Sequence, residues 1–170
     1  DWIHHVITKG AVTSVPTLPT TSILKAHWDA SDYESLTLSG TSVSQIDDLS
    51  GNGWHLVQSE SSMQPSYTGS GQNGMAILDF ATNKFMNVDF SDISQPYTIV
   101  AAVMFPIITG SQENVYDDFD DTTSSTGMAI DSNNIVVYAP SSLSYDGTPY
   151  DGEWQYFVNY YDGSDSFTRL

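Results

Sequence analysis

Short apolar runs separated by turn-forming residues recur along this chain, and they restrict its fold more than any other sequence feature. In no window of about 11–18 residues do apolar residues recur with the period of an amphipathic helix. Turn clusters such as Ser-Gly-Asn-Gly at 50–53 and the glycine-rich segment 69–74 follow one another about every ten residues, a spacing typical of antiparallel sandwiches. The pattern therefore predicts an all-β fold.

Two of the predicted strands stand out. Tyr97–Phe105 is the strongest apolar run and is expected to be buried on both faces. Trp154–Tyr161 is long and aromatic, and Asp162-Gly163 after it predicts a hairpin to a strand at 167–170. The other predicted strands cover residues 23–29, 43–49, 54–58, 75–80, 85–90, 115–119, 127–131 and 135–139.

Residues 1–22 are predicted to form an extended arm, because Pro16 and Pro19 lie three residues apart and exclude a helix there. The remainder, residues 23–170, is predicted to be one antiparallel β-sandwich. A composition of 39% hydrophobic and 12% aromatic residues is sufficient for a packed core.

Acidic residues far outnumber basic ones, at 21 Asp and Glu against 4 Lys and Arg, which gives a formal net charge of −17. This balance argues against nucleic-acid partners and anionic membrane surfaces, since both need Lys and Arg. It permits Ca²⁺ and polyhydroxyl partners. Cysteine is absent, which excludes disulfides and thiolate chemistry. The longest apolar run, 99–108, is too short to span a bilayer and contains Pro106, so no membrane insertion is expected.

A family resemblance rests on the order of several short motifs. The most specific element is Asp-Leu-Ser-Gly-Asn-Gly at 48–53. The other motifs are Trp-Asp-Ala-Ser-Asp at 28–32, Gln-Pro-Ser-Tyr at 64–67, Gly-Gln-Asn-Gly at 71–74, Leu-Asp-Phe at 78–80 and the strand that begins at Tyr97. In this order they resemble the laminin-G-like branch of the concanavalin A-like lectin/glucanase superfamily, in particular the modules of phage tail and virion proteins and of bacterial surface proteins.

This resemblance implies a jelly-roll of two antiparallel sheets over about residues 23–170, with an adhesive or structural role. One departure is Ile46, where such modules commonly have an aromatic residue. A second is that the chain stops at Arg169-Leu170, inside the expected return strand. The last strands are therefore expected either to be missing from this sequence or to be supplied by another chain, since an open sheet edge invites pairing.

The densest acidic cluster is a candidate Ca²⁺ site, because Ca²⁺ binds six to eight oxygen ligands. The alternative is a solvated acidic loop, since no EF-hand pattern is present. Its carboxylates are those of Asp117, Asp118, Asp120 and Asp121. A candidate glycan site consists of aromatic and amide side chains expected in or near loops, namely Asn114, Tyr116, Tyr145 and Tyr150.

Other acidic residues have a structural explanation. Asp29 and Asp48 are expected to accept backbone N–H bonds in the turns that follow them, although a second cation site with Asp32 and Asp47 is an alternative. Trp28, Trp54 and Trp154 are expected in the core. No Glu-x-Asp-x-(x)-Glu run of the glucanases occurs, so glycosidase activity is only a remote alternative.

The predicted function is therefore non-enzymatic and has no required cofactor apart from the candidate Ca²⁺. We expect a structural or adhesion module of a virion, as tail fibre or capsid decoration, that assembles as a homo-oligomer and binds host surface glycans. The alternative is a carbohydrate-binding module of a bacterial secreted or surface protein, because both classes use the same fold. The expected location is a virion or the cell exterior.

Overall fold

The described part of the chain is all-β, as predicted: it consists of antiparallel strands and three short 3-10 helices. The computed structural model describes residues 24–90, 96–105, 113–117, 127–131, 134–138, 143–145, 152–161 and 167–169. No helix within these ranges has the length and apolar character needed to cross a membrane. The predicted arm, residues 1–22, lies outside them.

The chain divides into two compact units, Asp1–Ser91 and Asp92–Leu170, and each is described by itself. A single sandwich over residues 23–170 stays a prediction.

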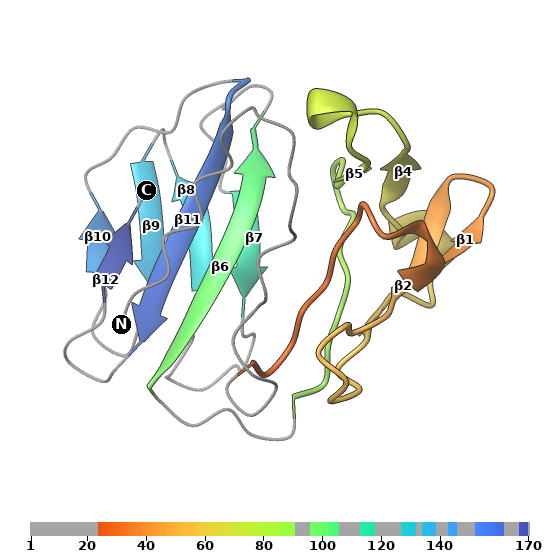
Figure 1. Ribbon diagram of the computed structural model, residues 1–170. Coiled ribbons are helices and arrows are strands. Elements are labelled where there is room, and N and C mark those ends of the chain that lie inside the picture. Colours follow the sequence, from red (N-terminus) through yellow and green to blue (C-terminus); the bar gives the residue numbers. More distant parts are fainter. Residues whose placement is uncertain are drawn as a thin grey trace. The chain divides into compact units, whose positions relative to one another are not determined.

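The first unit contains a five-stranded antiparallel sheet in the order β1-β2-β4-β5, with β3 also pairing β2 (Figure 1). One edge of β2 pairs with β1, and its other edge is shared by β3 and β4. The elements are η1 (Tyr33–Ser35), β1 (Leu36–Ser39), β2 (Ser42–Ile46), β3 (Leu56–Val57), η2 (Ser61–Met63), β4 (Ser66–Thr68), η3 (Gln72–Gly74) and β5 (Ile77–Asp79).

A bulge in β2 explains why its sequence shows no clean alternation. Thr37 pairs with Gln45, but the next residue, Leu38, pairs with Val43, so Ser44 is the extra residue. The extra residue brings Val43 and Ile46, three positions apart, to the same face, and both are buried. Ile46 thus supplies core packing where the resemblance implied an aromatic residue.

The second unit contains two antiparallel sheets that form two layers, with β6 and β11 in one and β7, β8 and β9 in the other (Figure 1). Their strand orders are β12-β11-β6 and β10-β9-β8-β7. The strands are β6 (Tyr97–Met104), β7 (Glu113–Asp117), β8 (Gly127–Asp131), β9 (Asn134–Tyr138), β10 (Leu143–Tyr145), β11 (Trp154–Tyr161) and β12 (Phe167–Arg169).

The core of the second unit lies between these two sheets. Four buried residues form its centre. They are Met128 on β8, Phe105 directly after β6, and Phe157 and Tyr161 on β11. Partly buried side chains of β6 and β7 pack around them, namely Tyr97, Ile99, Val103, Val115 and Tyr116. Each layer therefore covers one face of the other.

Several predicted strands are confirmed, with small shifts at their ends. β8 and β11 have the predicted bounds, and β11 pairs with β12 as the hairpin signal predicted. The structure corrects two others: residues 24–29 and 85–90 contain no strand, apart from an isolated bridge between Val57 and Asn87. β1, β4 and β10 were not predicted, since none of them contains two adjacent apolar residues.

The expectation that Tyr97–Phe105 is buried on both faces is wrong for the described residues. Burial alternates along β6: Ile99 and Val103 face the core, whereas Thr98, Val100 and Ala102 are exposed. The physical reason is that the opposing sheet covers only one face of β6. A run of apolar residues alone does not distinguish one covered face from two.

Candidate functional site

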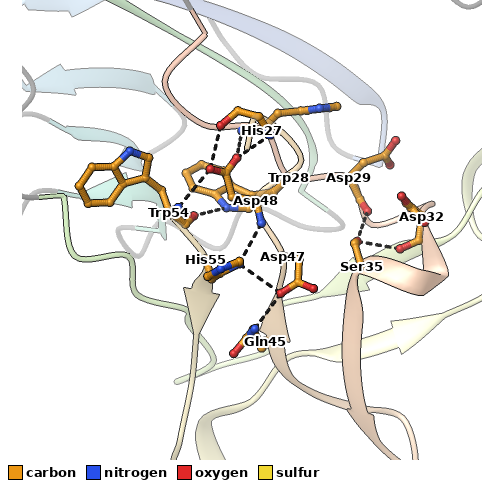
Figure 2. A network of polar contacts seen from close by, with 11 residues as sticks. His27, Trp28, Asp29, Asp32, Ser35, Gln45, Asp47, Asp48, Trp54 and His55 are labelled. Carbon is orange, nitrogen blue, oxygen red and sulfur yellow. Dashed lines mark hydrogen bonds and ion pairs between the residues drawn. The ribbon is translucent and has the colours of Figure 1, made fainter. Parts of the chain in front are cut away.

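The carboxylate of Asp48 is the centre of the polar network in the first unit (Figure 2). Oδ1 accepts hydrogen bonds from the backbone N–H of His27 at 2.9 Å and of Ser50 at 2.9 Å. Oδ2 accepts from the Ser50 hydroxyl at 2.7 Å and from the backbone N–H of Trp54 at 3.1 Å. Leu49 in turn donates its N–H to the carbonyl of His27 at 2.8 Å.

These bonds set the protonation state of Asp48. Burial opposes the charged form, but the hydrogen bonds from His27, Ser50 and Trp54 outweigh it and hold the pKa of the carboxyl below its usual value of 3.8. A carboxylate with four donors on its two oxygens has its acceptor capacity largely used. The predicted structural role of Asp48 is confirmed, and it exceeds a local turn, because His27 lies 21 residues away.

Asp29 has the same type of role at an earlier turn of the chain. Its Oδ1 accepts from the backbone N–H of Ser31 at 2.8 Å and from the Ser31 hydroxyl at 2.7 Å. This Asx turn precedes η1, where Ser35 donates its hydroxyl to the carbonyl of Asp32. The structural prediction for Asp29 is therefore confirmed as well.

Asp47 lies beside Asp48 but interacts with different partners. Gln45 donates to its Oδ1 at 2.7 Å, and Nδ1 of His55 lies 3.1 Å from the same oxygen. Nδ1 is also 3.2 Å from the backbone N–H of Asp48. Nδ1 of His55 therefore lies within hydrogen-bond distance of both the Asp47 carboxylate and the backbone N–H of Asp48. Within the described residues, no group of three or more side chains is arranged to hold a metal ion.

Only the first member of the predicted Ca²⁺ cluster lies in the described part of the chain. Asp117 ends β7, and its Oδ2 accepts from Nδ2 of Asn114 at 3.2 Å. Asp118, Asp120 and Asp121 lie outside the described residues, so the Ca²⁺ site stays a prediction. The structure does bring Asn114 and Asp117 together at the surface, and both side chains are exposed.

The predicted glycan site is only partly described. Tyr116 lies in β7 rather than in a loop, and its hydroxyl is 2.6 Å from that of Tyr161 on β11. Asn159 donates to the Tyr116 hydroxyl, and the Tyr161 hydroxyl reaches the carbonyl of Gly127 at 3.3 Å. Tyr150 lies outside the described residues, and only the backbone of Tyr145 is placed, in β10.

The phenol of Tyr116 therefore contributes to a polar network inside the second unit. Burial raises the pKa of Tyr116 to about 12, although the hydrogen bonds from Tyr161 and Asn159 act in the opposite direction. Burial also raises the pKa of Tyr161. Oδ1 of Asn159 is buried without a hydrogen-bond partner among the described residues. The glycan contacts of Asn114, Tyr116, Tyr145 and Tyr150 stay predictions.

An aromatic surface lies on the face of β6 and β11 that points away from the core of the second unit. The register pairs directly opposite residues on one face: Trp154 with Met104, Tyr156 with Ala102, Val158 with Val100, and Tyr160 with Thr98. We call these eight residues the β6–β11 outer face. Tyr156 is 54% exposed and Val100 67% exposed. No member carries a charge.

The sequence pattern does not reveal this surface, because Trp154–Tyr161 is one aromatic run and Trp154 is expected in the core. Trp154 is half-buried. The available signal was the two-residue period of a strand: alternate positions carry Trp154, Tyr156 and Tyr160, while Phe157 and Tyr161 occupy the other face. Both faces are aromatic, so the sequence did not show which one is covered.

Comparisons with family models, with curated proteins and with solved structures found no match to this chain.

Proposed function

We propose that this chain is a non-enzymatic jelly-roll module of the laminin-G-like type, which serves adhesion or structure in a virion or an extracellular surface assembly. We further propose that its ligand is a surface glycan. The observation that carries the proposal is the uncharged aromatic β6–β11 outer face. Aromatic side chains that share one face of a sheet give a surface on which the apolar faces of sugar rings can stack.

The position of this surface on paired strands supports binding. β6 and β11 pair over eight consecutive residue pairs without a register shift. Phe157 and Tyr161, which alternate with Tyr156 and Tyr160 along β11, are fixed in the core. The aromatic rings on the outer face therefore stand on a rigid backbone, which lowers the entropy lost on binding.

Two acidic side chains that hold turns, Asp48 and Asp29, support a non-enzymatic role. Both oxygens of Asp48 accept hydrogen bonds from the protein. Asp29 accepts two from Ser31. A carboxylate engaged in this way holds a turn and is not free to act as a nucleophile or a general base.

Glycan array binding tests the proposal. Wild type should bind a defined subset of glycans, and Tyr156→Ala should weaken that binding about tenfold, or about 1.4 kcal/mol. Tyr33→Ala is the matched control, because Tyr33 is 57% exposed but lies in the first unit. The glycan affinity of Tyr33→Ala should remain within about twofold of wild type.

Two results would contradict glycan binding through this face. One is the absence of specific binding across a broad array by a folded wild-type chain. The other is an equal loss in Tyr156→Ala and Tyr33→Ala. Hydrolysis of a polysaccharide panel by the pure chain would contradict the non-enzymatic assignment.

A further inference from the structure

Among the strands that the structure describes in the second unit, three of the four sheet edges have features that discourage pairing with another chain. β10 and β12 are only three residues long. β7 has acidic residues at both ends, Glu113 and Asp117, and a register shift between Asn114 and Tyr116. Short strands, charges and bulges are the usual means by which an exposed edge avoids association.

The fourth edge, β6, has none of these features. It is eight residues long, and its pairing with β11 shows no register shift. Among the described residues it pairs only with β11. It lies in the longest stretch of the sequence without a charged residue, 93–112. Val100, near its middle, is 67% exposed, the highest value among the exposed large hydrophobic side chains of the described chain.

We infer that β6 pairs antiparallel with β6 of a second copy of this chain, so that two three-stranded sheets join into one. The strand is complementary to itself in the register that places Val100 opposite Val100 of the other copy. In an antiparallel pair, opposite residues share a face. This register places Ile99 opposite Ala101 on the core side, and Thr98 opposite Ala102 on the outer side.

Charge favours β6 as the meeting point of two copies. Each copy carries a net charge of −17, so most approaches bring carboxylates together. At β6 the two copies meet along strands without any charge. The joined sheet extends the β6–β11 outer face across both copies, but the pairing does not depend on whether that face binds a glycan.

Sedimentation equilibrium of the full chain over a wide concentration range tests this inference. Wild type should show a reversible monomer–dimer equilibrium. Val100→Lys and Val100→Asp each place like charges opposite one another at the two-fold axis, so each should raise the dissociation constant at least about tenfold. An equimolar mixture of the two variants should recover most of the affinity, because Lys then faces Asp.

Tyr156→Lys is the control for this experiment. Tyr156 lies on the same outer face but on β11, one strand away from the open edge. If the two copies pair through β6, the dissociation constant of Tyr156→Lys should remain within about threefold of wild type. Equal weakening by Val100→Lys and Tyr156→Lys would indicate contact through the face and overturn the strand pairing. A chain that is monomeric at all concentrations, or a mixture without recovery, would also overturn it.

A disulfide provides a second readout that does not depend on the stability of charged variants. The chain has no cysteine, so Val100→Cys introduces a single thiol. Opposite Cα atoms of an antiparallel pair lie about 4.5–5.5 Å apart, within the range that a disulfide needs. Val100→Cys should oxidise to a covalent dimer at least about tenfold faster than Tyr156→Cys. Equal rates in the two folded variants would contradict the register.

Discussion

Asp48 shows how much one side chain can determine in a small domain. Its two oxygens connect three stretches of backbone that contain no regular strand, at His27, Ser50 and Trp54. Trp28 strengthens the same connection, because its indole N–H donates to the carbonyl of Trp54 at 2.7 Å. The rings of Trp28 and Trp54 both pack against Phe90, with centroids 6.1 Å and 5.2 Å away.

We expect Asp48→Asn to lower the free energy of unfolding by about 1–3 kcal/mol. The amide retains one acceptor oxygen but places an NH₂ group against donors that Asp48 now satisfies, such as the N–H of Trp54. Urea unfolding at neutral pH measures the loss. Asp47→Asn is the matched control, because its side chain is 45% exposed, and its change should remain within about 0.5 kcal/mol.

Acid pH provides a check on this assignment. Folding lowers the pKa of Asp48. The charged carboxylate therefore stabilises the fold at any pH above its pKa in the unfolded chain, and this contribution is lost as the pH falls through the lower pKa of the folded chain. The difference between wild type and Asp48→Asn should therefore shrink below about pH 3.8. A difference that does not vary with pH would contradict a role for the charge.

The Tyr116 and Tyr161 hydroxyls give a prediction at alkaline pH. The pKa of Tyr116 rises from 10.0 to about 12 on folding, so its contribution is fully present below about pH 10 and is lost as pH rises towards 12. Stability measured by urea unfolding should fall over that range, and phenolate absorbance should show a group that ionises late.

Tyr116→Phe should reduce this alkaline loss, because it removes one of the two buried hydroxyls. At neutral pH it should cost about 1 kcal/mol, since Tyr161 retains the Gly127 carbonyl as a partner. Tyr33→Phe, at an exposed tyrosine, is the control and should change the free energy of unfolding at neutral pH by less than about 0.5 kcal/mol. If Tyr116→Phe lost as much stability as wild type between about pH 10 and pH 12, the proposed role of this network would be contradicted.

At the scale of elements, turns position the short strands of the first unit. The loop before β5 closes when Gly71 donates its N–H to the carbonyl of Met75 at 2.8 Å. Ile77, at the start of β5, packs directly on Gly71. A Cβ atom at position 71 would lie 2.6 Å from Cγ1 of Ile77 and 2.7 Å from its Cγ2. Both contacts are too short to be accommodated without movement.

Gly71→Ala should therefore lower the free energy of unfolding by about 1–3 kcal/mol. Gly69→Ala, in the same loop, is the control, because the added Cβ would lie 3.4 Å from its nearest neighbour, the Tyr67 hydroxyl. Chemical unfolding of both variants measures the difference. The double variant with Gly71→Ala and Ile77→Ala should be less destabilised than the sum of the two single variants. If it is not, the contact with Ile77 is not the cause of the loss in Gly71→Ala.

The strands that the sequence predicted well contain adjacent apolar or aromatic residues. β8 and β11 agree with the expected bounds, and β6 ends one residue earlier. β1, β4 and β10 escaped prediction because Ser or Thr separates their few apolar residues, whereas β3 and β5, which are no longer, each begin with two adjacent apolar residues. Residues 85–90 have strand-like composition, but within the described chain their one bridge is the isolated pairing of Asn87 with Val57.

At the scale of the whole molecule, the net charge of −17 sets how stability responds to salt. Carboxylates repel one another, and dissolved ions screen that repulsion. We expect the melting temperature to rise with NaCl. Scanning calorimetry of the full chain over a range of NaCl concentrations measures the effect, and a melting temperature indifferent to salt would contradict it.

Calcium adds a separate expectation. If residues 117–121 bind Ca²⁺, CaCl₂ should raise the melting temperature more than NaCl at the same ionic strength, because binding to the folded state adds to screening. Asp117→Asn should remove the additional rise, since Asp117 belongs to the predicted cluster. Equal effects of the two salts would contradict a specific site.

The sequence by itself determined the all-β class, the positions of the main turns, the lack of thiol chemistry and the strongly negative net charge. These follow from local periodicity, turn residues and composition. It also located Asp29 and Asp48 as turn-holding side chains, because an Asx turn is a local motif.

Only the tertiary structure decided which face of a strand is covered. β6 and β11 carry apolar residues on both faces, and the opposing sheet selects one as core and leaves Val100 and Tyr156 exposed. It also brought Asp48 to His27 and directed the Tyr116 hydroxyl towards Tyr161, 45 positions away. Such contacts depend on how the chain returns on itself, which local sequence patterns do not encode.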